Sequence, residues 1–246
     1  MLMDDLAYAN RLRLAHPAEK AGFAALCLLA SLLARTPWVP LLVALVVSAA
    51  TLGLARIPLR SWVRLSLLPA GFLLAGGLSL ALEMGGQGGL RLSFSPASLR
   101  LALQVTARSL GCTAAMLFLA ATTPLTDLIQ LLRWFRVPGL VIEMLTITYR
   151  ALFILLETSS QMQRAQASRL GYGGFRLSLR SLAQLISRLF GRSLERADLA
   201  WRALLSRGYG QELAVLSPEY RLSPGRILAG GGVGVLLLGL ATGVGR

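Results

Sequence analysis

The sequence predicts an all-α integral membrane protein with about five transmembrane helices and a separate cytoplasmic domain of amphipathic helices. Three observations support this prediction. Hydrophobic residues make up 55% of the 246-residue chain, and its mean hydropathy is +0.64. Charged residues make up only 15%, against the usual quarter in soluble domains. The apolar residues also gather in runs of roughly 20, the length that crosses about 30 Å of hydrocarbon.

Five apolar runs are read as membrane spans, and charged residues or turn residues separate them. They cover residues 18–34, 39–55, 63–84, 101–121 and 227–244. A glycine-rich turn, residues 85–89, follows the third run. The predicted organisation is a cytoplasmic N-terminal segment (1–17), four transmembrane helices (18–124), a cytoplasmic domain (125–226) and a last transmembrane helix (227–246).

A sixth apolar run, residues 140–156, differs from the others because it carries Glu143 and Arg150. Charges are costly at the bilayer centre, and arginines collect in cytoplasmic loops. A crossing here would place the arginine-rich segment that follows, residues 158–226, on the outer side. We therefore predict that 140–156 lies in or dips into the cytoplasmic face, with a further span as the alternative.

Two short phrases within 125–226 are near copies of each other. One reads Ser168-Arg169-Leu170-Gly171-Tyr172-Gly173 and the other Ser206-Arg207-Gly208-Tyr209-Gly210. Each closes a predicted helix, residues 161–169 and 182–207, and glycine just past a helix favours the left-handed capping conformation. A purely structural role for the arginine of each phrase would be to complement the negative end of the helix dipole, which is worth about 0.3–1 kcal/mol.

The helix predicted at 182–207 is amphipathic, and an arginine-rich turn around Arg176 and Arg180 is expected before it. Its apolar residues recur every three to five positions, and Arg188, Arg192 and Arg196 follow each other at i, i+4 spacing on another face. Such a helix can lie on anionic lipid. Docking to a soluble partner explains more, because lipid binding does not require the capped Ser-Arg ends.

Several other functions fit the residues poorly. A phosphate-binding loop needs a Gly-Lys-Ser/Thr sequence, whereas the only lysine, Lys20, stands in Glu-Lys-Ala. His16 is the only histidine and precedes a proline, so helix entry suits it better than metal binding. Cys27 and Cys112 lie in apolar runs and are read as packing residues. The net charge of +14 fits cytoplasmic loops better than nucleic-acid binding. An enzyme of lipid chemistry would need a cluster of acidic residues, and Asp4-Asp5 is the only adjacent acidic pair in this sequence.

The two arginine phrases resemble the paired Ala-Arg-Gly-type motifs in the transmembrane coupling subunits of energy-coupling factor transporters. The N-terminal phrase is similar to the CbiQ branch of that family, which serves cobalt uptake; it runs from Asp5-Leu6-Ala7-Tyr8 through Asn10-Arg11-Leu12 to His16-Pro17-Ala18-Glu19-Lys20. This chain departs from the motif in having serine at the first place of both copies and Leu170 at the third place of the first. Arginine is kept in both copies.

The resemblance implies a non-enzymatic, multi-pass subunit of the bacterial inner membrane that belongs to an ATP-driven cobalt importer. Its cytoplasmic coupling domain would dock two ABC ATPase subunits through Ser168, Arg169, Leu170, Ser206, Arg207 and Gly208, with Arg188, Arg192 and Arg196 in supporting coupling helices. ATP and magnesium would be bound by the ATPases. Cobalt would be bound by a CbiM-like membrane subunit, with which a small CbiN-like subunit is also expected. No cofactor or catalytic residue is expected in this chain. The same role for nickel or a vitamin, and a non-transport assembly or regulatory role, remain the alternatives.

Overall fold

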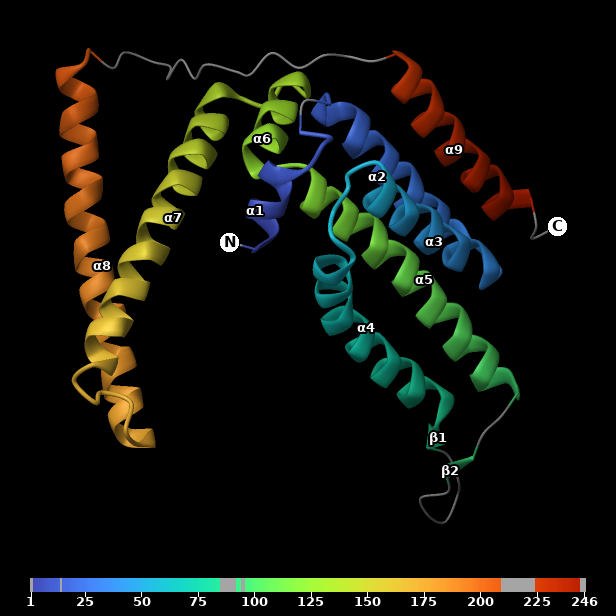
Figure 1. Ribbon diagram of the computed structural model, residues 1–246, viewed down its shortest axis with the longest axis horizontal. Helices are drawn as coiled ribbons and strands as arrows, with labels where there is room; N and C mark the ends of the chain where they lie inside the picture. Colours follow the sequence, from blue (N-terminus) through green and yellow to red (C-terminus); the bar gives the residue numbers. More distant parts are fainter. Residues whose placement is uncertain (1, 14, 85–91, 94–95, 209–223, 244–246) are drawn as a thin grey trace. The chain divides into compact units, whose positions relative to one another are not determined.

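The computed structural model describes residues 2–13, 15–84, 92–93, 96–208 and 224–243, and these residues are helical apart from loops and one short strand pair (Figure 1). The helices are α1 (Leu2–Ala9), α2 (Pro17–Leu33), α3 (Trp38–Gly53), α4 (Leu59–Ala81), α5 (Pro96–Thr122), α6 (Leu125–Trp134), α7 (Gly139–Ala167), α8 (Phe175–Ser206) and α9 (Pro224–Gly243). The predicted turn 85–89, the end of the second phrase (Tyr209 and Gly210) and the last residue of the fifth run, Val244, lie outside the described residues.

The expected helices of the five apolar runs correspond to α2, α3, α4, α5 and α9. The prediction for the third run, residues 63–84, is wrong at its C-terminal end. Helix α4 ends at Ala81, and residues 83–84 form strand β1 (Glu83–Met84), which pairs antiparallel with β2 (Leu92–Ser93). Hydropathy alone cannot distinguish the last turn of a span from an apolar strand that follows it.

The chain divides into two compact units, Met1–Leu128 together with Pro218–Arg246, and Ile129–Ser217. In the first unit α5 packs against α1, α2, α3 and α4. Its core is built largely from small side chains, so the helices approach closely. Gly111 is a contact point, because a Cβ there would clash with the Ser31 hydroxyl and lie 2.9 Å from the Pro40 carbonyl oxygen.

Helix α9 packs along α2 and runs in the same direction (Figure 1). Gly230 lies against Phe23, and Gly234, four residues further on, lies against Leu26. Because residue numbers rise together along both helices, the two helices start at the same end of the bundle. Leu237 and Ala241 are buried in the same core.

Three helices in the described part of the chain, α4, α5 and α7, are long and apolar enough to cross a membrane, judged by length and composition. Helix α3 and residues 228–243 of α9 are shorter apolar helices. No residue in the apolar window of α4 is fully buried inside the protein. Phe72 and Leu68 there are about four-fifths exposed, which is what a lipid-facing helix presents and a soluble bundle avoids. The chain is therefore an all-α membrane protein.

The second unit contains the helical hairpin of α7 and α8. Helix α7 is continuous, so the apolar run 140–156 and the predicted helix 161–169 are one element. Residues 140–167 contain neither glycine nor proline, and nothing in the sequence interrupts the helix there. Helix α8 begins at Phe175, where the Ser178 amide donates to the Gly174 carbonyl at 2.8 Å. Arg176 and Arg180 are therefore helical, and the expected arginine-rich turn is wrong.

Candidate functional site

The two Ser-Arg phrases occupy equivalent places, each at the C-terminal end of a long helix. Ser168-Arg169-Leu170 follows the last residue of α7, and Ser206-Arg207-Gly208 includes the last residue of α8. The similarity extends further back than the serine, because an Arg-Ala pair, Arg164-Ala165 in one copy and Arg202-Ala203 in the other, lies one helical turn earlier. Both phrases belong to the same compact unit.

The two phrases fold into the same helix end. The Ser168 hydroxyl donates to the Ala165 carbonyl at 2.9 Å, and the Ser206 hydroxyl donates to the Ala203 carbonyl at 3.0 Å. The amides of the two motif arginines each donate to the carbonyl three residues earlier, at 3.2 Å for Arg169 and 3.1 Å for Arg207. These bonds satisfy carbonyls that the end of a helix leaves without partners. The two phrases thus share a backbone structure as well as a sequence.

The third position of each phrase takes the left-handed conformation. In the second copy this residue is Gly208, with φ 72°, as glycine capping predicts. In the first copy it is Leu170, with φ 58°, and not Gly171. The expectation that a glycine would supply the left-handed residue of both caps is therefore wrong for the first. A leucine in this conformation is strained, because its Cβ approaches the following carbonyl oxygen.

A small hydrogen-bond network holds the first phrase in place, and sequence reasoning did not find it. The Gln166 side chain donates to the Ser181 carbonyl at 3.0 Å and accepts from the Tyr172 hydroxyl at 2.7 Å. The Ser181 hydroxyl donates to the Gly171 carbonyl at 2.7 Å. A Cβ on Gly171 would lie 2.9 Å from both the Gln166 carbonyl oxygen and the Ser181 hydroxyl. The glycine after Leu170 is therefore required for close packing, which the spacing of the phrase did not indicate.

Arg169 and Arg207 are exposed. Within the described part of the chain, neither guanidinium has a hydrogen bond or ion pair; Arg202, one turn before Arg207, pairs with Asp198 at 2.8 Å. A helix rises 1.5 Å per residue, so the 32 residues of α8 set the two caps about 48 Å apart. Two such distant cations cannot hold one small anion between them.

Large exposed apolar side chains lie close in sequence to each motif arginine. Leu170 is 78% exposed and Phe175 is 86% exposed beside the first cap. Trp201 and Leu205 are about half exposed near the second. Arginine and aromatic side chains, here Phe175 and Trp201, are enriched at protein-protein interfaces. Both caps therefore suit contacts with a protein.

The predicted supporting arginines lie on α8 between the two caps. Arg188, Arg192 and Arg196 are exposed and continue, at helical spacing, the line of Ser181 and Leu185, the two residues of α8 that are buried. The apolar side chains of this helix lie on a different face, and most of them are exposed: Leu182, Ile186, Leu194, Trp201 and Leu205. Helix α8 is thus amphipathic, as predicted.

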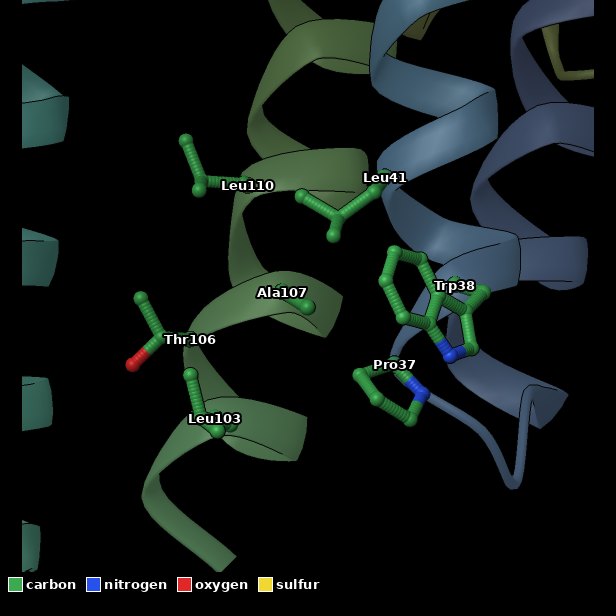
Figure 2. Close-up of a pocket in the computed structure, with 7 residues that line it drawn as sticks. All are labelled: Pro37, Trp38, Leu41, Leu103, Thr106, Ala107 and Leu110. Carbon is green, nitrogen blue, oxygen red and sulfur yellow. The ribbon is translucent and has the colours of Figure 1, made fainter. Parts of the chain in front are cut away.

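The described residues offer no group of three or more histidine, cysteine or acidic side chains that could hold a metal. His16 caps α2, because its Nδ1 accepts from the Ala18 amide at 3.2 Å. A shallow groove of about 240 Å³ lies between the start of α3 and α5 (Figure 2). Trp38 and Leu41 line one side of this groove, and the Thr106 oxygen points away from them. The groove lacks the convergent polar groups of a ligand site.

The fold and the paired caps together define a helical membrane protein with a second compact unit, in which each of the two long helices ends at an exposed arginine. The model of the family CbiQ, described as cobalt transport protein, matches residues 9–216. The chain belongs to this family.

Curated relatives agree with this assignment. The cobalt transport protein CbiQ of Rhodobacter capsulatus is 38% identical over 183 residues, which cover 74% of each chain. The cobalt transport protein CbiQ of Salmonella typhimurium is 33% identical over 162 residues, covering 62% of this chain and 72% of its own. A Methanocorpusculum labreanum protein named as a fused cobalt transport protein CbiMQ is 28% identical over 232 residues, which are 91% of this chain and 39% of the fused one. These relatives are named as transport proteins and not as enzymes.

Proposed function

We propose that this protein is the transmembrane coupling subunit of an energy-coupling factor ABC importer for cobalt ions. It would transmit the ATP-driven motion of cytoplasmic ATPases to a membrane subunit that binds the ion. Membership in the CbiQ family and the relatives named for cobalt transport support the substrate. The observation that carries the coupling role is the pair of equivalent, exposed arginine caps at opposite ends of α8.

The proposed topology has five spans, α2, α3, α4, α5 and α9, in the bacterial inner membrane. The parallel packing of α9 along α2 supports this number, because both helices must then enter the membrane from the same side. Four crossings return the chain to that side after α5. Helices α7 and α8 must therefore add either no crossing or two, and the arginines of α8 argue against two. The coupling domain, residues 125–226, would then lie in the cytoplasm.

The proposed mechanism uses each arginine cap as a handle for one ATPase. Arg169 and Arg207 would each enter a groove of one ATPase subunit and pair with a carboxylate there. Arginine suits this role because its planar guanidinium is always charged and binds carboxylates through two parallel hydrogen bonds. The separation of about 48 Å along α8 supports two docking sites on two subunits over one shared site. Closure of the ATPases would then move the two caps relative to each other.

The remaining components of the complex are proposed from the relatives. The fused relative carries both names, CbiM and CbiQ, in one chain. This supports a CbiM-like membrane subunit, which would bind cobalt, beside the present chain; a small CbiN-like subunit is a further candidate. ATP and magnesium would be bound by the ATPases, so that this chain holds no cofactor of its own.

Co-purification of the ATPases with tagged protein tests the proposal. The double variant Arg169→Ala/Arg207→Ala should lose both the ATPases and cobalt uptake. The double variant Arg164→Ala/Arg202→Ala is the matched control, because it removes the exposed arginine five residues before each motif arginine. It should retain both properties. ATPases that still co-purify with the first variant, with normal uptake, would refute the docking role. Docked ATPases that drive nickel or vitamin uptake in place of cobalt would correct only the substrate.

A further inference from the structure

The N-terminal phrase that resembles the cobalt branch has no part in the docking mechanism, yet its polar residues are buried. Lys20 is 4% exposed and Asn10 is 9% exposed. Both donate hydrogen bonds to the last turn of α5, immediately before the short link between α5 and α6. The second compact unit begins after Leu128, within α6, so this link is the covalent connection through which the chain leaves the first unit.

The end of α5 lacks one of the backbone donors that would follow it. Pro124 has no amide hydrogen, so it cannot donate to a carbonyl in the last turn of the helix. The Lys20 ammonium donates to the Thr122 carbonyl at 3.0 Å. The Asn10 amide nitrogen donates to the same carbonyl at 3.2 Å and lies 3.4 Å from the Ala121 carbonyl oxygen. The N-terminal phrase therefore caps a helix that is distant in sequence.

The first turn of α6 is held by the same N-terminal segment. The buried Asp127 carboxylate attracts the Lys20 ammonium electrostatically. The hydroxyl groups of Tyr8 and Thr126 lie 3.3 Å apart, within hydrogen-bond distance. Residues on both sides of Pro124 thus interact with the N-terminal segment. Lys20 acts on both sides, through a hydrogen bond to Thr122 and through electrostatic attraction to Asp127.

A second helix end in the bundle offers a direct comparison. At the opposite end of the α2–α5 pair, the Arg108 guanidinium donates to the Ala34 carbonyl at 2.7 Å. Arg108 and Lys20 have the same role, because each is a partly or fully buried cation that donates to a carbonyl at a helix C-terminus. Only Lys20 does so at the joint between α5 and α6.

We propose that Tyr8, Asn10 and Lys20 form a clasp on the α5–α6 joint, and that Lys20 is a positioning residue for energy coupling. With the joint rigid, displacement of α6 moves α5 and the bundle around it. With the joint loose, the same displacement is absorbed by a bend at Pro124. This inference rests on the proposed coupling function, because it assigns to the joint the transmission of motion that begins at the arginine caps.

The test compares cobalt uptake per ATP hydrolysed by the assembled complex in proteoliposomes. The variant Lys20→Met/Asp127→Asn removes both charges together, so no unpaired charge is left buried. Its ATPases should co-purify in the normal ratio, because both arginine caps are intact. Uptake per ATP should fall about fivefold or more, the low end of usual coupling between sites. Arg108→Met is the matched control, and it should lower the melting temperature without lowering uptake per ATP.

Two results would overturn the proposal. One is unchanged uptake per ATP in Lys20→Met/Asp127→Asn. The other is an equal fall in Arg108→Met, which would show that any weakening of the bundle uncouples transport. If the double variant does not assemble, Asn10→Ala, which removes the other donor to Thr122, is subjected to the same comparison and the same criteria. Failure of the proposed coupling function would be seen in a different measurement. In that case the ATPases would not co-purify with the unaltered protein, or would still co-purify with Arg169→Ala/Arg207→Ala.

Discussion

Replacing Leu170 with glycine should stabilise the turn between α7 and α8. Leu170 holds a left-handed conformation, φ 58°, that costs a residue with a Cβ roughly 1–2 kcal/mol. The side chain is 78% exposed, so its removal sacrifices little burial. Glycine is more flexible in the unfolded chain, which offsets roughly 0.5–1 kcal/mol of the gain. The net expectation is a local stabilisation of about 0.5–1 kcal/mol.

Hydrogen exchange at the turn measures this effect directly. The Gly171 amide donates to the Gln166 carbonyl at 2.9 Å and exchanges only when the turn opens. Its exchange should slow about two- to fivefold in Leu170→Gly, the factor that corresponds to the expected free energy. Gly208→Ala is the reciprocal variant: its Cβ would meet open space, so strain at φ 72° alone should weaken the second cap by about 1 kcal/mol.

Gly173→Ala is the neutral control, because its backbone is not left-handed and a Cβ there makes only ordinary contact. Exchange at Gly171 that stays unchanged or becomes faster in Leu170→Gly would refute the assignment of strain to Leu170. So would a change of equal size in the neutral control, since it would show that the turn responds to any substitution.

Three further predictions concern packing and burial. Gly171→Ala should destabilise the same turn by about 1–3 kcal/mol, seen as faster proteolysis between α7 and α8, whereas Gly173→Ala should leave it unchanged, because its Cβ makes only ordinary contact. Gly111→Ala should force α2 and α3 away from α5 and lower the melting temperature, and Gly71→Ala, in open space on α4, should not; equal melting temperatures would contradict the close packing. Lys20 should react with a water-soluble amine reagent at least about tenfold more slowly than an exposed amine, because reaction needs local opening; rapid labelling would show that it is not buried.

The sequence allowed the five apolar helices of the first unit to be placed within about five residues, but not α1 or α6. Long apolar runs bounded by arginine, proline or glycine have few other structures open to them in a membrane. The C-terminal end of α4 was missed because apolar residues continue into β1. Helix α7 was divided in two because its polar second half, from Glu157 onward, ends the hydropathy signal without ending the helix.

The candidate site was found from the sequence but its geometry was not. Repetition of the Ser-Arg phrase identified both helix ends, since local signals are enough to mark a C-terminus. Three features leave no periodic pattern in the sequence, and two of them depend on contacts between distant residues. These are the left-handed Leu170, the Gln166 network and the capping of Thr122 by Lys20. In the sequence, Lys20 stood out for lacking the context of a phosphate-binding loop and as the end of the N-terminal phrase, and neither feature indicated that it caps α5.

The most direct test of the central claim is to count the ATPase subunits that one chain can capture through its two caps. With Cys27 and Cys112 replaced by serine, Ser168→Cys and Ser206→Cys would be introduced singly and together, and the purified complex treated with a short thiol cross-linker. Each single variant should link to one ATPase subunit, and the double variant should link to two, because the caps lie about 48 Å apart on α8. Both positions linking to one and the same subunit, or neither linking to any, would contradict the account.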